Sequence, residues 1–159
     1  MIGFLRQARP EDLETINQLA YESEAYWSHD EALLKQFASL YKLTAATLKE
    51  NITYVMTGDC GGENIVAFFC IKPEGHTANL EHFYVRRDLI GQGLGRKLWR
   101  QLIGLCWEKG FDKLEGVTFP KTLPFYLKMG ASQKGSVKSK LNTGQLIPKF
   151  RFNIKNEPR

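Results

Sequence analysis

Residues 85–98 have the sequence VRRDLIGQGLGRKL, in which Gly91, Gly93 and Gly95 alternate with larger residues. A β-rich run precedes this stretch, and apolar residues at helical spacing follow it. Closely spaced glycines between a strand and a helix let the backbone approach an anion, and the helix N-terminus favours negative charge there. The stretch therefore predicts a phosphate-binding turn.

Two common phosphate-binding motifs do not fit this spacing. The dinucleotide fingerprint GxGxxG needs a third glycine where the chain has Arg96, although Asp112 lies at a tolerable distance for the ribose-binding acid. The P-loop needs Gly-Lys followed by Ser or Thr, whereas Gly95 is followed by Arg96 and Lys97. Both motifs miss, the P-loop more clearly.

Outward from the turn, hydrophobic periodicity predicts strands and helices in one α+β domain. We expect strands at Gly3–Ala8, Ile52–Met56, Ile65–Ile71, Ala78–Val85, Lys113–Phe119, Val137–Leu141 and Leu146–Ile154, the last two flanking a turn at Asn142-Thr143-Gly144. We expect helices after Pro10-Glu11-Asp12, from a capping box at Ser28 and Glu31, from Leu94 to near Gly110, and at Leu123–Met129.

The glycine turn resembles the acyl-CoA loop of the GNAT acetyltransferase superfamily, which has Arg or Gln, two residues, Gly, one residue, then Gly or Ala. Gly93 and Gly95 match the two small positions. Ile90 stands in place of the Arg or Gln, and Arg87 stands where proline is common. The side chains that could replace the missing pyrophosphate contact are those of Arg86, Arg96 and Lys97.

The resemblance covers nearly the whole chain. The segment Pro124–Ala131, PFYLKMGA, is similar to the family signature FY-x-K-x-GF, with Ala131 in place of the usual aromatic residue. The family implies an α+β fold: a mixed, mostly antiparallel sheet of about seven strands, flanked by about four helices, with splayed strands forming the acyl-CoA cleft. Residues 1–159 would form this single domain.

The resemblance also implies an N-acetyltransferase that moves the acetyl group of acetyl-CoA to a primary amine, by direct transfer through a tetrahedral intermediate. We expect this amine to belong to a small molecule, with a peptide or protein amine as the alternative. Backbone groups of the splayed strand, Leu80 to Val85, would pair with the pantetheine arm and stabilise the oxyanion. The residues expected to bind the cosubstrate are Phe83, Tyr84, Val85, Gly91, Gln92, Gly93, Leu94, Gly95 and Arg96.

Three residues are candidates for proton transfer. Tyr126 matches the tyrosine that protonates the departing thiolate in many family members. Glu81 is our preferred base for the amine, and His82 or water is the alternative, because the intrinsic pKa of histidine is near neutrality. Strand alternation points Glu81 and His82 to opposite faces unless a bulge intervenes.

The identity of the acceptor is harder to predict. The N-terminal 31 residues are rich in acids, so an acidic and aromatic pocket wall would suit a cationic amine. The conceivable lining residues are Glu22, Glu24, Tyr26, Trp27 and His29. Homodimerisation, which is common in such enzymes, stays open.

Composition limits the other classes. The 159 residues contain no apolar run long enough to span a membrane, and Met1–Arg9 lacks the apolar core of a signal peptide, so we expect a cytoplasmic protein. Cys60, Cys70 and Cys106 form no CxxC pair, so neither a disulfide framework nor a zinc or other metal site is expected.

Two other functions remain as alternatives. The first is a non-catalytic acyl-CoA-binding regulatory module, suggested by Ile90 in place of the family's Arg or Gln. The net charge of +5 and the basic C-terminal segment with Phe150 and Phe152 motivate a nucleic-acid-binding domain, although a solvated basic hairpin explains that segment more simply.

Overall fold

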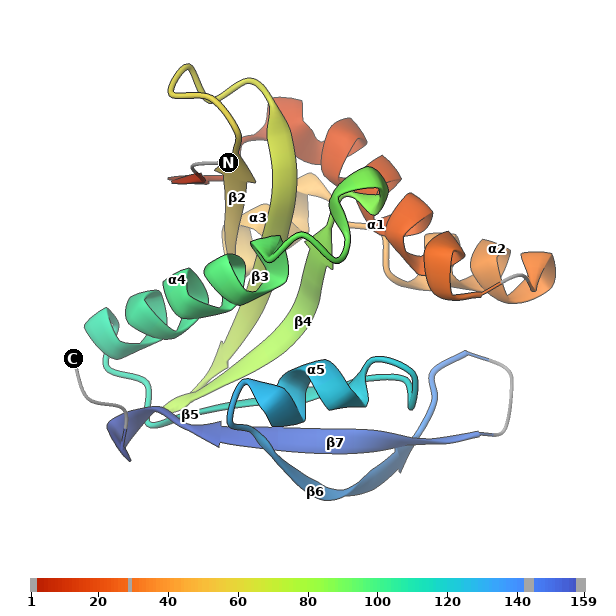
Figure 1. Ribbon diagram of the computed structural model, residues 1–159, viewed down its shortest axis with the longest axis vertical. Coiled ribbons are helices and arrows are strands. Elements are labelled where there is room, and N and C mark those ends of the chain that lie inside the picture. Colours follow the sequence, from red (N-terminus) through yellow and green to blue (C-terminus); the bar gives the residue numbers. More distant parts are fainter. Residues whose placement is uncertain (1–2, 29, 142–144, 157–159) are drawn as a thin grey trace.

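The computed structural model describes residues 3–28, 30–141 and 145–156. One sheet contains β1 (Phe4–Gln7), β2 (Ile52–Thr57), β3 (Ile65–Glu74), β4 (Thr77–Val85), β5 (Lys113–Val117), β6 (Ser132–Lys138) and β7 (Leu146–Asn153), in the order β1-β2-β3-β4-β5-β7-β6. The helices are α1 (Leu13–Trp27), α2 (Glu31–Leu40), α3 (Ala45–Glu50), α4 (Leu94–Glu108) and α5 (Leu123–Lys128) (Figure 1). This is the expected mixed, mostly antiparallel α+β architecture.

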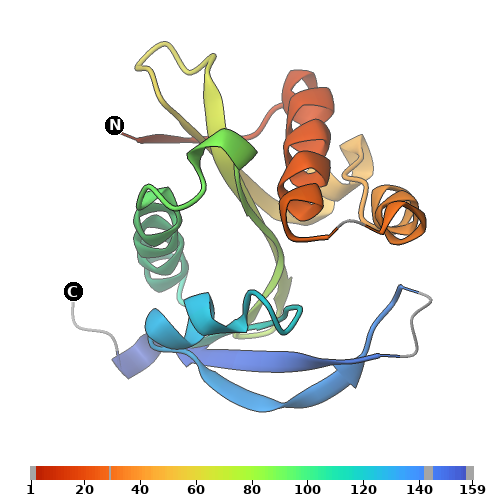
Figure 2. The same ribbon diagram turned by 45° about the vertical axis from the view of Figure 1, so that its right-hand side comes forward.

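The sheet splits in its middle, between β4 and β5. These neighbours run parallel, whereas the other pairs of adjacent strands are antiparallel. They pair only from Thr77–Leu80 to Lys113–Gly116, and β4 then continues to Val85 while still paired with β3. Figure 2 shows the β2–β4 group and the β7–β6 ribbon diverging from this point. Residues 81–85 therefore present an edge of backbone groups that β5 does not cover.

Hydrophobic side chains on both faces of the sheet hold the helices in place. One cluster joins Phe69 and Leu80 to Leu98 and Leu102 of α4 and to Tyr126 of α5. The second cluster lies on the other face and joins Phe68 and Cys70 to Ile16 of α1 and Phe37 of α2. Because the sheet alternates its side chains between these clusters, α4 and α5 lie on one face of the sheet and α1 and α2 lie on the other face.

Several predicted boundaries need correction. Helix α2 is capped by Asp30, whose carboxylate accepts from the Leu33 N–H, and not by Ser28. Helix α3 was not expected. Strand β6 lies at Ser132–Lys138 rather than at the predicted Val137–Leu141. The prediction missed its limits because the strand is exposed along its whole length and shows no apolar alternation. The expected turn at residues 142–144 lies outside the described residues.

A β-bulge interrupts β4 at Glu81, directly after Leu80, the last residue that pairs with β5. Cys70 pairs with His82 and Ile71 pairs with Leu80, so Glu81 is an extra residue on β4. A bulge changes the alternation of side chains locally and increases the twist of the strand. The expectation from strand alternation excepted a bulge between Glu81 and His82, and that exception applies here, so the two side chains need not point to opposite faces.

Candidate active site

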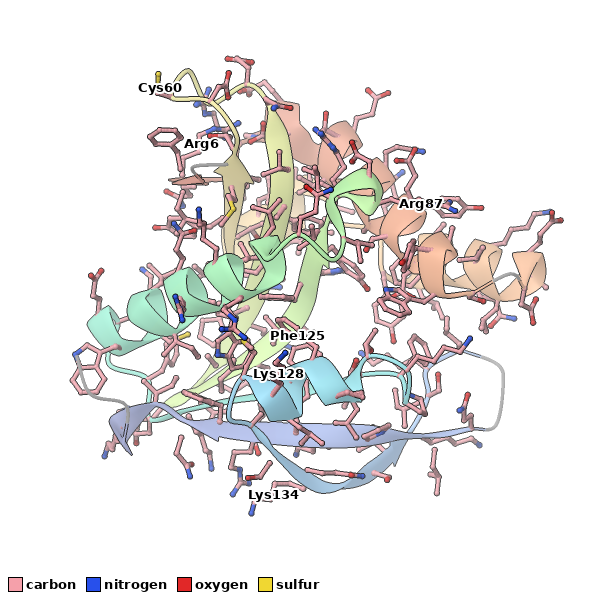
Figure 3. The ribbon with its side chains drawn as sticks, in the orientation of Figure 1. Arg6, Cys60, Arg87, Phe125, Lys128 and Lys134 are labelled. Carbon is pink, nitrogen blue, oxygen red and sulfur yellow. The ribbon has the colours of Figure 1, made fainter. Side chains whose placement is uncertain are left out.

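A cavity of about 700 Å³ opens where β4 and β5 separate. The residues that line it lie on both faces of the sheet. They belong to the C-terminal part of α1, the bulged half of β4, the glycine turn, α5 and the β6–β7 pair. Phe83 contributes to this lining while packing against the rings of Phe125 and Tyr126, at centroid distances of 5.6 and 6.0 Å. Figure 3 shows Phe125 on the side of α5 that faces β4. The cavity thus passes through the split from one face of the sheet to the other.

The glycine turn forms one end of this cavity. Gly91 and Gly93 both have φ of 87°, a left-handed conformation that residues with a Cβ rarely adopt, and Gly93 is the N-cap of α4. A Cβ at Gly95 would lie 3.1 Å from Cε1 of Phe125, so the third glycine allows α4 to approach α5. These requirements for backbone shape and close packing explain the spacing of the three glycines.

Most of the residues expected to bind the cosubstrate line the cavity. They are Phe83, Tyr84, Val85, Gly91, Gly93, Gly95 and Arg96. The side chains of the other two point elsewhere: Leu94 is buried in the core on the α4 side, and Gln92 is exposed, with its amide donating to the Asp88 carbonyl at 3.4 Å. Any contribution from these two positions would come from their backbone.

The basic side chains near Ile90 differ in how well they are placed to replace the missing Arg or Gln. Ile90 itself lines the cavity. Arg86 is engaged by Asp88 at 2.7 Å and by Asn64 at 3.1 Å. Arg96, in the first turn of α4, lines the cavity and is the better placed of these two.

The bulge brings Glu81 and His82 to the same cavity. Glu81 is exposed, whereas His82 is 7% exposed and its ring lies among those of Tyr41, Phe68 and Tyr84. Burial, together with the positive charge of Lys140, lowers the pKa of His82 to about 4. The imidazole is therefore neutral at pH 7, and because its pKa is low it is a weaker base than an ordinary histidine.

Tyr126 lies deep in the cavity wall. Its ring stacks on Phe150 at 4.2 Å between centroids, and its exposed fraction is 8%. Burial first, and then the negative charge of Glu24, raises the pKa of Tyr126. The phenol is therefore fully protonated near neutrality and can only donate its proton as strong negative charge develops nearby.

Glu24 joins α1 to the splayed strand. The Tyr84 hydroxyl donates to Glu24 Oε1 at 2.9 Å, and this is the one side-chain hydrogen bond to the carboxylate among the residues described. Desolvation raises the pKa of Glu24, while the bond from Tyr84 lowers it by a smaller amount. Sequence reasoning placed Glu24 on the acceptor wall, but its link to Tyr84 joins residues 60 positions apart and has no local signal.

The other expected acceptor residues divide into two groups. Trp27 lines the cavity with Glu24, and the carbonyl of Trp27 accepts from Lys121 Nζ at 3.2 Å. Glu22 and Tyr26 are outside the lining, and His29 lies outside the described residues. Tyr41 and Phe37 of the α2 region line the cavity as well and were not predicted.

The described residues contain neither a metal-binding cluster nor a membrane-spanning helix. Within the described ranges, no three His, Cys, Asp or Glu side chains cluster as metal ligands. No described helix combines the length and apolar character required to cross a membrane. Cys70 and Cys106 are buried, Cys60 is exposed, and none of the three lines the cavity.

Comparisons with known proteins agree with this geometry. The model of the acetyltransferase (GNAT) family matches residues 11–131. No curated protein sequence matches the chain. Among solved structures, a GCN5-related N-acetyltransferase from Rhodopseudomonas palustris has a TM-score of 0.76 at 21% identity, with 96% of each chain covered.

Two further solved structures have a similar fold. The PaiA N-acetyltransferase from Thermoplasma acidophilum, solved in complex with coenzyme A, has a TM-score of 0.72 at 17% identity, covering 94% of this chain and 98% of its own. The ribosomal-protein-S18-alanine N-acetyltransferase from Escherichia coli has a TM-score of 0.71 at 18% identity, covering 99% and 100%. At these identities the likeness concerns the fold.

Proposed function

The chain belongs to the acetyltransferase (GNAT) family, and we propose that it transfers the acetyl group of acetyl-CoA directly to a primary amine of a small molecule. One observation carries the proposal. The uncovered edge of β4, the glycine turn and Tyr126 all border a single cavity that also reaches the acidic end of α1. Donor and acceptor can therefore enter from opposite faces of the sheet and meet at the bulge.

The donor would be held mainly by backbone. The N–H groups at the start of α4 and the turn at Gly91–Gly95 suit the pyrophosphate, with Arg96 as a basic side chain beside it. The uncovered backbone of residues 81–85 offers hydrogen bonds to the pantetheine arm and to the thioester carbonyl oxygen.

The reaction itself needs two proton transfers. The amine nitrogen attacks the thioester carbon, the C–N bond forms, and the C–S bond then breaks. Glu81, directly or through water, would take a proton from the amine, and Tyr126 would give a proton to the departing thiolate. Glu81 is favoured over His82 because burial has lowered the pKa of His82 to about 4.

An acyl-enzyme route through cysteine has less support. Burial raises the pKa of Cys106 to about 12 and also raises that of Cys70. A thiol with so high a pKa is almost entirely protonated at pH 7 and is a poor nucleophile. Direct transfer requires no covalent intermediate on the protein.

The test is release of free thiol from acetyl-CoA in the presence of a panel of primary amines. Turnover with at least one amine, lost in the Gly93→Glu variant, is the expected result. Binding of CoA without turnover over the whole panel would instead support the non-catalytic acyl-CoA-binding module.

A further inference from the structure

Two lysines line the cavity on the side of the β6–β7 pair. Lys138 ends β6, and Lys140 follows two residues later. Glu24 and Trp27 line the same cavity from the end of α1. Figure 2 shows the β6–β7 ribbon and the α1–α2 pair as separate parts of the fold facing one another. The acceptor side of the cavity thus has one acidic wall and one basic wall.

The basic wall has charge that the protein itself does not neutralise. Lys149 also lines the cavity, but its ammonium lies 3.9 Å from Glu115, which is bound more closely by Arg151 at 2.8 Å. In the described part of the chain, no carboxylate lies within ion-pair distance of Lys138 or Lys140. These two ammonium groups are therefore available to an anion that enters the cavity.

The positive charge of Lys140 acts on groups beside the proposed reaction site. Its ammonium lies 6.0 Å from the centroid of the Tyr41 ring, which meets the His82 ring edge-on at 6.3 Å. Lys140 also contributes to the lowered pKa of His82, next to the bulge. A lysine pointing only into bulk solvent would have little such effect, because water screens its charge.

We infer that the acceptor carries an anionic group, a carboxylate or a phosphate, which Lys138 and Lys140 bind while Glu24 faces its amine. This inference rests on the proposed acetyltransferase function and narrows its substrate class. Lysine is a common partner of both anions, and opposite charges on the two walls of the acceptor side fix the direction in which such a molecule binds.

The phosphates of acetyl-CoA do not account for these lysines. The glycine turn and Arg96 lie at the N-terminus of α4, whereas Lys138 and Lys140 belong to the β6 region, on the other side of the cavity from that turn. Lys134 serves as a matched control, because it is on β6 but does not line the cavity. Figure 3 shows Lys134 on the side of β6 that faces away from α5.

The experiment compares kcat/KM for acceptors that differ only in the anionic group. One pair is an amino acid and its amide, and the second is an aminoalkyl phosphate and the matching amino alcohol. We expect the wild-type protein to prefer an anionic member by about tenfold or more, since a charged hydrogen bond contributes about 1.5–3 kcal/mol. Whichever pair shows the larger preference identifies the anion as carboxylate or phosphate.

Variants test whether the two lysines cause the preference. In Lys138→Gln/Lys140→Gln the preference should fall to near unity through the acceptor KM, with the KM for acetyl-CoA unchanged. Lys134→Gln should behave as wild type. The charge-reversed variant Lys138→Glu/Lys140→Glu should instead favour a diamine, an effect that a merely structural role of the lysines would not produce.

Four outcomes would contradict this account, and they differ in what they leave standing. Equal use of the anionic and neutral members, or a preference that survives the double variant, refutes the anion subsite but leaves the acetyltransferase function intact. A strong preference for an acidic peptide over the free acid refutes a small-molecule acceptor. Failure to acetylate any acceptor, with CoA still bound, contradicts the proposed function itself.

Discussion

The hydroxyl of Tyr84 on β4 donates a 2.9 Å hydrogen bond to the carboxylate of Glu24 on α1. This bond connects the bulged strand, where acetyl transfer is proposed, to the helix that forms the acidic wall of the cavity. It leaves the rest of the carboxylate directed to a cavity with aromatic sides, which suits an alkylammonium group.

Replacing Glu24 with Gln should therefore weaken binding of the amine. We expect the acceptor KM to rise about tenfold, because one charge-assisted contact is lost, while the KM for acetyl-CoA stays unchanged. Steady-state kinetics with each substrate varied in turn measures both constants. Glu22→Gln is the control, because Glu22 is exposed on the same helix outside the cavity; equal effects of the two variants would refute the role of Glu24.

A glutamate at Gly93 should abolish binding of acetyl-CoA. It places a carboxylate against the pyrophosphate and forces a residue with a Cβ into φ of 87°. Gly110→Glu is a matched control, because Gly110 has φ of 83° and lies at the far end of α4, and a Cβ added at either glycine would meet no atom within 4 Å. Calorimetric titration with CoA should give no measurable binding for the first variant and wild-type affinity for the second. Unchanged affinity in Gly93→Glu would exclude the turn as the pyrophosphate site.

Removing the hydroxyl of Tyr126 should slow the chemical step. Tyr126→Phe keeps the ring that stacks on Phe150, so the melting temperature should change little. We expect kcat to fall by about 100-fold or more, the usual range for loss of a general acid, with little change in the KM for acetyl-CoA. Wild-type turnover in this variant would show that the thiolate obtains its proton elsewhere.

Burial of His82 should make the fold sensitive to mild acid. The unfolded chain binds a proton at a pKa near 6.5, whereas the folded protein binds it only near pH 4, so stability decreases as the pH falls through this window. Between pH 7.5 and pH 5 the free energy of unfolding should fall by about 2 kcal/mol from this group alone.

Urea unfolding at the two pH values measures the effect. His82→Gln should lose much less stability than wild type between them, whereas His76→Gln, at an exposed turn residue, should follow wild type. The carboxyl of Asp12 does not complicate the comparison, because its hydrogen bonds from Arg6 hold its pKa below the usual range and thus below this window. Parallel losses in wild type and His82→Gln would contradict the assignment.

The sequence predicts best what local chemistry determines. The strand, the alternating glycines and the helix from Leu94 are coded within residues 77–108, because left-handed turns and apolar stripes leave direct marks on the chain. The same holds for the β2–β3 hairpin and for α5 closed by Gly130, whose φ is 106°.

Features that depend on distant partners were harder to predict. The bulge at Glu81 arises from the register between β3 and β4, and the residue types near Glu81 do not predict it. Strand β6 is exposed at every position, so pairing with β7 and not burial determines its limits. Helix α3 has six residues and buries none of them, which leaves no apolar period to detect.

The central claim is direct acetyl transfer from acetyl-CoA to an amine at the split in the sheet. The most direct measurement follows both products of one reaction, free CoA by its thiol and the N-acetylated amine by mass spectrometry, together with the intact mass of the protein. We expect the two products in equal amounts, no acetylated protein intermediate, and no products with Gly93→Glu. Thiol release without an acetylated amine, or an acetyl group retained on the protein during turnover, would contradict it.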